Sequence, residues 1–133
     1  MTYTGGCHCG AVRYEVSGEP QHVALCHCSD CRKAAGAPMV AWVAFADDDF
    51  AITKGAVVTH NSSGASMRSF CGTCGTGLLF RNAEMLPGIV DIQSVTLDDP
   101  GALPPSVHIQ TADRISWMET AHELPAFRHY PGQ

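Results

Sequence analysis

Seven cysteines, gathered in three short clusters, are the feature that most constrains how this chain of 133 residues can fold. The clusters are Cys7 with Cys9, then Cys26 with Cys28 and Cys31, and finally Cys71 with Cys74. An odd number of cysteines cannot pair completely into disulfides. Closely spaced cysteines in a chain without secretory features are typical of metal or redox sites. We therefore interpret them as thiolate ligands for metal.

The composition is that of an ordinary globular protein and excludes several function classes. Hydrophobic residues make up 45% of the chain and charged residues 16%, with a formal net charge of −5. No lysine- or arginine-rich run provides a nucleic-acid-binding surface, and no apolar run is long enough to span a bilayer. The first ten residues lack a basic stretch followed by an apolar one, the pattern of a secretory signal. We expect a cytoplasmic protein that binds neither nucleic acid nor membranes.

Short apolar or alternating runs, separated by turn residues, predict a mainly β fold. Val12, Tyr14 and Val16 lie on one face of an expected strand at residues 11–16. Other strands are expected at residues 22–26, 39–45, 50–53, 57–61, 67–70, 77–80, 89–97 and 107–110. The one helix-like segment, residues 29–35, is followed by Gly36, a common helix terminator.

No linker divides the sequence, so we expect one domain spanning residues 1–133. The segment after residue 110 carries Trp117, Leu124 and Phe127, which we expect to pack onto the core. The sequence does not predict the oligomeric state.

The third cluster, Cys71-Gly72-Thr73-Cys74-Gly75, is the sharpest single motif. Two cysteines separated by two residues supply half of a tetrahedral zinc site, and glycines permit the tight turn between them. Backbone N–H groups in such a turn can point at the sulfurs and stabilise their negative charge. This half-site needs two more ligands from elsewhere in the chain.

Counting ligands favours one partition of the remaining cysteines. If Cys7 and Cys9 complete the site, Cys26, Cys28 and Cys31 remain together. Three protein ligands with an open fourth position are the pattern of a catalytic zinc. If the central cluster supplied the two ligands instead, three thiols would have no evident use. We therefore expect two zinc ions per chain, one structural and one catalytic.

Alternatives remain open at this point. The central cluster could hold a second structural zinc, with a histidine such as His8 or His27 as the fourth ligand. A redox pair at Cys28 and Cys31 lacks the usual βαβ context. Iron suits a four-thiolate site chemically, although the spacing matches neither common iron–sulfur pattern.

Three segments together resemble the glutathione-dependent formaldehyde-activating enzyme and centromere protein V family. They are Gly6-Cys7-His8-Cys9-Gly10, Cys26-His27-Cys28-Ser29-Asp30-Cys31-Arg32-Lys33 and Phe70-Cys71-Gly72-Thr73-Cys74-Gly75. The similarity also includes Gly36-Ala37-Pro38, Trp42 and the closing Leu124-Pro125-Ala126-Phe127, so it covers nearly the whole chain.

The resemblance implies an Mss4-like fold, in which β-sheets surround a zinc-stapled core. It also implies that Cys7, Cys9, Cys71 and Cys74 bind structural zinc, whereas Cys26, Cys28 and Cys31 bind catalytic zinc. The family's founding activity joins glutathione to formaldehyde to form S-(hydroxymethyl)glutathione, or reverses that step, as a carbon–sulfur lyase. The implied partner is a small-molecule thiol such as glutathione.

An open zinc position explains how such a site could act, because a coordinating thiol loses its proton and becomes a nucleophile at neutral pH. The thiolate would attack an aldehyde carbon. Glutathione carries two carboxylates, so we expect cations near it, with Arg32 and Lys33 the first candidates. Further candidates are Arg68 and Arg81 as cations, Trp42 and Phe45 as walls or core, and His60 and His108 as proton carriers. His27 is expected to be exposed.

Two other functions compete with the enzyme. The first is a non-catalytic zinc-binding interaction module of Mss4-like fold, which would not need an open metal position. The second is a protein similar to methionine sulfoxide reductases, which would need a reactive cysteine free of metal. The clustering of Cys26, Cys28 and Cys31 favours metal binding over a free thiol.

Overall fold

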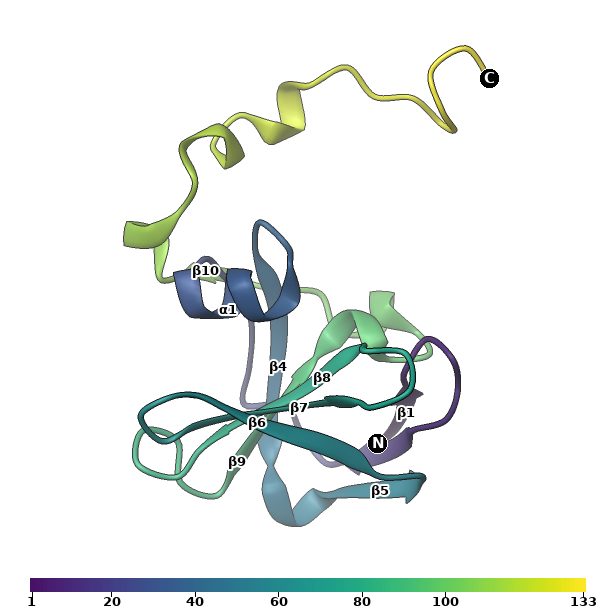
Figure 1. Ribbon diagram of the computed structural model, residues 1–133, viewed down its shortest axis with the longest axis vertical. Coiled ribbons are helices and arrows are strands. Elements are labelled where there is room, and N and C mark those ends of the chain that lie inside the picture. The colour runs from purple at the N-terminus through teal and green to yellow at the C-terminus, as the bar shows by residue number, and fades with distance from the viewer.

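Two β-sheets dominate the computed structural model, which describes residues 1–133 (Figure 1). The smaller sheet has the order β1-β2-β5 and contains β1 (Thr2–Gly6), β2 (Arg13–Ser17) and β5 (Phe50–Lys54). The larger sheet has the order β10-β3-β4-β9-β8-β7-β6. Its strands are β3 (His22–Cys26), β4 (Val40–Ala46), β6 (Val57–Ser63), β7 (Ser66–Cys71), β8 (Gly77–Asn82), β9 (Ile89–Gln93) and β10 (Val107–Ile109). The mainly β class is confirmed and fits the Mss4-like arrangement that the resemblance implies.

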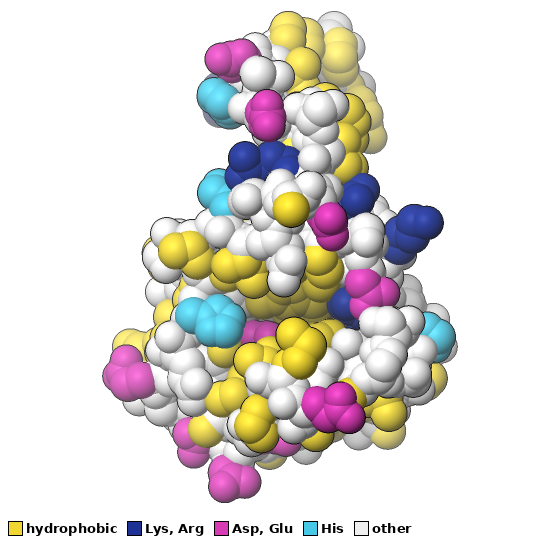
Figure 2. Space-filling model, turned by 90° about the vertical axis from the view of Figure 1, so that its left-hand side faces the viewer, with side chains coloured by type: hydrophobic (Ala, Val, Ile, Leu, Met, Phe, Trp, Pro, Cys, Tyr) yellow, Lys and Arg dark blue, Asp and Glu magenta, His cyan; other side chains and the backbone are white.

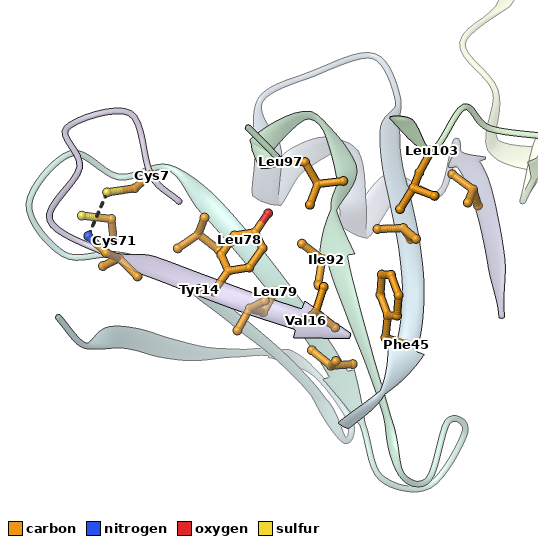
Figure 3. Packing of buried hydrophobic residues seen from close by; sticks show 14 residues of the cluster. Cys7, Tyr14, Val16, Phe45, Cys71, Leu78, Leu79, Ile92, Leu97 and Leu103 are labelled. Carbon is orange, nitrogen blue, oxygen red and sulfur yellow. Dashed lines mark hydrogen bonds between the residues drawn. The ribbon is translucent and has the colours of Figure 1, made fainter. Parts of the chain in front are cut away.

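Alternation of side chains along the strands builds the core between the two sheets. On and just before β2, Val12, Tyr14 and Val16 are all buried, as their spacing predicts. They pack with Phe45 of β4 and Ile92 of β9, among others (Figure 3). The other face of the larger sheet carries a second, smaller buried cluster, which includes Cys26 and Cys31.

The single α-helix, α1 (Ser29–Ala35), connects β3 to β4 and has the bounds that the sequence predicts. It ends at Gly36, whose φ of 64° lies in the left-handed region that glycine adopts without strain. The Gly36 N–H donates to the Arg32 carbonyl at 2.8 Å. None of the helices is both long enough and apolar enough to cross a membrane.

Strand β1 was not among the expected strands, because Thr2–Gly6 contains one large apolar residue and two glycines. Backbone pairing with β2 forms it, with Thr2 opposite Ser17 and Gly6 opposite Arg13. A side chain at Gly5 would collide with the Tyr14 hydroxyl and the Thr96 carbonyl, so only glycine fits there. The expected strand at residues 89–97 ends earlier, because the chain forms a 3₁₀ turn over Ser94–Thr96.

The expectation that the C-terminal segment packs onto the core is wrong. Trp117, Leu124 and Phe127 are 57%, 65% and 59% exposed. Residues 111–123 form three separate 3₁₀ turns, which cannot present a continuous apolar face to the sheets. The segment extends away from the sheets in Figure 1, and the core between the sheets is filled without it.

Candidate metal-binding site

Four cysteines from both sheets meet at one end of the core. Cys7 and Cys9 follow β1, whereas Cys71 ends β7 and Cys74 lies in the turn before β8. All four sulfur atoms lie within 4.8 Å of one another, and no disulfide joins them. Cys7 and Cys71 are buried, and Figure 3 shows both at the end of the apolar core. The group therefore links the small sheet to the large one.

Backbone N–H groups surround these sulfurs, as the turn sequence predicts. The Thr73 and Cys74 N–H groups donate to Cys71 Sγ at 3.3 and 3.4 Å, and the Val12 N–H donates to Cys7 Sγ at 3.2 Å. Hydrogen bonds from the Thr76 hydroxyl and backbone lower the pKa of Cys74 to about 5. Such contacts stabilise the thiolate form that metal binding requires.

The other three cysteines meet where β3 joins α1. Cys26 is the last residue of β3, Cys28 is the N-cap of α1, and Cys31 lies in its first turn. The Cys28 sulfur accepts from the Cys31 N–H at 3.2 Å, and so takes the capping role that a serine or aspartate oxygen usually fills. The three sulfurs lie within 4.8 Å of one another, and no histidine, aspartate or glutamate joins them.

Arg68 of β7 is the cation that faces the three-cysteine group. Its guanidinium donates to Cys31 Sγ at 3.4 Å and to the Asp30 carboxylate at 2.9 Å. The guanidinium carbon also lies 4.9 Å from the centre of the Phe80 ring. Ser62 and Ser63 donate to Asp30, at 3.0 and 3.2 Å, so the β6–β7 hairpin holds the start of α1 in place.

The three thiols share negative charge unequally. Hydrogen bonding with Cys26, then with Cys28 and Arg68, lowers the pKa of Cys31 to about 5 despite its burial. The pKa of Cys26 is raised, first by its contact with Cys31 and then by burial. Burial and the same neighbour raise the pKa of Cys28. The contact with the Arg68 guanidinium therefore favours the thiolate form of Cys31.

His27 is 1% exposed, which corrects the expectation of an exposed residue. Its Nε2 lies 2.9 Å from Nδ1 of His108, and its backbone N–H donates to the Ile109 carbonyl at 3.1 Å. Both partners belong to β10, which pairs in parallel with β3 and covers this residue. His27, which lies between Cys26 and Cys28 in the sequence, is therefore buried because β10, a strand distant in sequence, adds to the edge of the sheet.

The proposed substrate cations lie in different surroundings. Arg32 is half-buried and donates from Nε to the His27 carbonyl at 3.3 Å, whereas Lys33 is exposed. Neither lines the cavity beside the three-cysteine group, and Arg68 does. Arg81 pairs with Asp47 at 2.8 Å, away from both cysteine groups. The sequence ranked Arg32 first because it lies next to Cys31 in the chain, whereas the cation that contacts the Cys31 sulfur is Arg68; the role of Arg32 and Lys33 in substrate binding stays a prediction.

The aromatic and histidine candidates separate in the same way. Phe45 is fully buried in the main core. Trp42 lies on the face of the large sheet opposite to Phe45 and lines the cavity beside the three-cysteine group. His60 of β6 lines the same cavity. His108 is instead paired with His27.

The chemistry of the donors fits metal ions at both groups. Each offers only cysteine sulfur, a soft ligand that suits zinc. Four sulfurs can complete a tetrahedron, whereas three leave one position free. The chain is thus a mainly β protein with two cysteine groups that could hold metal ions.

Comparison with known proteins agrees with this class. The family model for "Glutathione-dependent formaldehyde-activating enzyme" matches residues 2–113. A curated relative from Halomonas elongata, named "Putative glutathione-dependent formaldehyde-activating enzyme", is 30% identical over 144 residues, covering 100% of this chain and 91% of the relative. The chain belongs to the glutathione-dependent formaldehyde-activating enzyme family.

A solved structure supports the fold. The crystal structure of a Rhodobacter sphaeroides protein has a TM-score of 0.61 and 24% sequence identity. The match covers 77% of this chain and 99% of that one.

Proposed function

We propose that this chain is a zinc-dependent enzyme of the carbon–sulfur lyase type, which acts on adducts between aldehydes and a thiol such as glutathione. The observation that carries the proposal is the three-sulfur group of Cys26, Cys28 and Cys31, which has no fourth ligand among the side chains. Family membership and the name of the Halomonas relative support glutathione as the thiol. In the same proposal, Cys7, Cys9, Cys71 and Cys74 hold a structural zinc ion.

Zinc at the three-cysteine group would lower the pKa of a coordinating thiol, so that its sulfur is nucleophilic at neutral pH. The chain's own residues orient and balance this site. Arg68 donates to Cys31, so its positive charge offsets part of the charge of three thiolates. Asp30, held by Arg68 and two serines, fixes the guanidinium in that position. The helix cap at Cys28 fixes the spacing of two of the sulfurs.

The test is thiol binding to cobalt-substituted protein. The absorption spectrum of tetrahedral cobalt changes when its free position accepts a sulfur ligand, and binding should release a proton because the thiol must deprotonate. We expect both signals with glutathione or another cellular thiol. The Cys28→Ser variant should keep the fold and lose the response.

The outcome also separates the enzyme from a non-catalytic zinc-binding module. If millimolar glutathione, cysteine and other cellular thiols all leave the cobalt spectrum unchanged, the enzyme proposal fails. A module that binds a protein partner through a closed metal site would give that result.

A further inference from the structure

A cavity of about 550 Å³ lies beside the three-cysteine group, between the end of α1 and one face of the large sheet. Two of its lining residues also contact that group: Arg68 bonds to Cys31, and Trp42 packs in the cluster with Cys26 and Cys31. Ala34 of α1 lines the same cavity. Figure 2 shows one face of the molecule, on which hydrophobic side chains gather in a hollow edged by acidic and histidine side chains. A molecule in the cavity would therefore be next to the reacting sulfur.

The size of the cavity exceeds what formaldehyde needs. A water molecule occupies about 30 Å³ of liquid, and a one-carbon aldehyde is only slightly larger. Pockets of about 300–1,000 Å³ hold molecules with tens of atoms. At about 550 Å³, this cavity falls within that range. A one-carbon group would leave most of it to water.

The lining favours an uncharged, partly apolar group. Trp42, Val58, Phe70 and Leu79 supply apolar surface. The Thr59 and Ser69 hydroxyls are 3.0 Å apart and bond to each other, so they need no ligand. Polar contacts to a ligand would come from His60 and Gln93, which also line the cavity.

Arg68 is the one lysine or arginine that lines the cavity, and its charge is already matched. Its guanidinium bonds to the Asp30 carboxylate at 2.9 Å and to Cys31 Sγ at 3.4 Å. A carboxylate in the cavity would lose water without finding a free cation, which is costly. The carboxylates of glutathione therefore fit outside this cavity better than inside it.

From these observations we infer that the cavity receives the carbon substituent of the aldehyde, and that the substrates are thiol adducts of uncharged aldehydes with an aromatic or branched substituent. This inference rests on the proposed function. In the forward direction, the thiol sulfur forms a bond to the carbonyl carbon, and the thiol proton ends on the carbonyl oxygen as a hydroxyl. The reverse breaks the same carbon–sulfur bond and returns the proton to sulfur. Neither direction changes an oxidation state overall.

The test compares exchange rates for thiol adducts of benzaldehyde, isobutyraldehyde and formaldehyde with the zinc-loaded protein, measured by exchange NMR. We expect kcat/KM for the two larger adducts to exceed that for formaldehyde at least tenfold. The Val58→Asp variant should reduce this ratio at least tenfold, because it places a carboxylate on the apolar wall. Val58 is 47% exposed, so the fold should tolerate the change. Thr59→Trp, which fills the cavity from another exposed position, should reduce the ratio in the same way.

A matched control makes the result specific. Val95→Asp places the same charge at a 67% exposed valine that does not line the cavity. This variant should keep the wild-type ratio. A preference for the formaldehyde adduct, or a ratio that neither Val58→Asp nor Thr59→Trp alters, overturns the inference and leaves the proposed function standing. If no adduct exchanges faster with protein than without it, the proposed function fails together with the inference.

Discussion

Asp91 of β9 should destabilise the folded protein at neutral pH, and Asp91→Asn should remove that pH-dependent cost. The residue is 6% exposed, and its Oδ1 has no hydrogen-bond partner. The Nε2 of His22 lies 3.8 Å from this oxygen, beyond hydrogen-bonding distance. Burial raises the pKa of Asp91 from 3.8 to about 6, against an opposing effect of His22. The charge of Cys31 adds to the rise.

The magnitude follows from linkage between protonation and folding. Well below pH 3.8, Asp91 is neutral in both folded and unfolded chains, so it adds no cost. As the pH rises, the unfolded chain ionises first and gains stability relative to the folded one. About one pH unit above the folded-state pKa, the difference is complete. A shift of about two pKa units corresponds to about 3 kcal/mol.

Urea denaturation from pH 4 to pH 7.5, at a fixed concentration of free zinc, measures this effect. We expect the free energy of unfolding of Asp91→Asn, relative to the wild type, to increase by about 2 kcal/mol between these limits, since part of the effect is already present at pH 4. The absolute stability of the variant is not the readout, since a buried amide without partners has its own pH-independent cost. Asp48→Asn, at an exposed position, is the matched control and should show no such change. A stability difference that stays constant with pH would refute the reasoning.

Two further predictions concern stability. Cys71→Ser should lower the free energy of unfolding by on the order of 4 kcal/mol, the value expected when a metal present at about a thousand times its Kd is lost. Cys28→Ser should instead leave a folded protein that loses only the more labile metal. Thermal melts and metal analysis test this, and equal unfolding of both variants would contradict it. Arg13 and Thr4 lower the pKa of Asp98 to about 2, so the stability that this carboxylate contributes is present above pH 4 and lost as the pH falls toward 2. Because Asp98 is half exposed, Asp98→Asn should lower the free energy of unfolding by less than about 1 kcal/mol at pH 7. If the variant and the wild type lose stability equally as the pH falls, the ion pair between Asp98 and Arg13 does not contribute.

Local patterns in the sequence were enough to predict the helix, most strands and the two cysteine groupings. Helix α1 needs only its own residues and Gly36, and the spacing of Val12, Tyr14 and Val16 sets one face of a strand. The turn at Cys71 and Cys74 likewise forms from neighbouring residues. Counting ligands then divided the remaining cysteines as the structure groups them.

The features that the sequence did not predict depend on contacts between distant segments. Arg68 reaches Cys31 across 37 positions of the chain, and nothing near either residue indicates that contact. His27 is buried because β10, some 80 residues later, adds to the edge of the sheet. The C-terminal segment carries Trp117, Leu124 and Phe127, and large apolar side chains of this kind are normally buried, but here they are exposed. In each case the contact that decides burial or pairing, or the lack of one, depends on residues far away in the sequence.

The four-cysteine group between the sheets also has a topological consequence. Cys9 and Cys71 are 62 positions apart, so a metal ion held by both closes a large ring of chain. Closing a ring of this size in a flexible chain costs on the order of 4 kcal/mol of entropy. Cys26, Cys28 and Cys31 all lie within that ring, whereas β10 lies outside it. Once the ring is closed, β3, α1 and β7 lose less conformational entropy when they come together. The strand β10, which covers His27, gains no such advantage because it lies outside the ring.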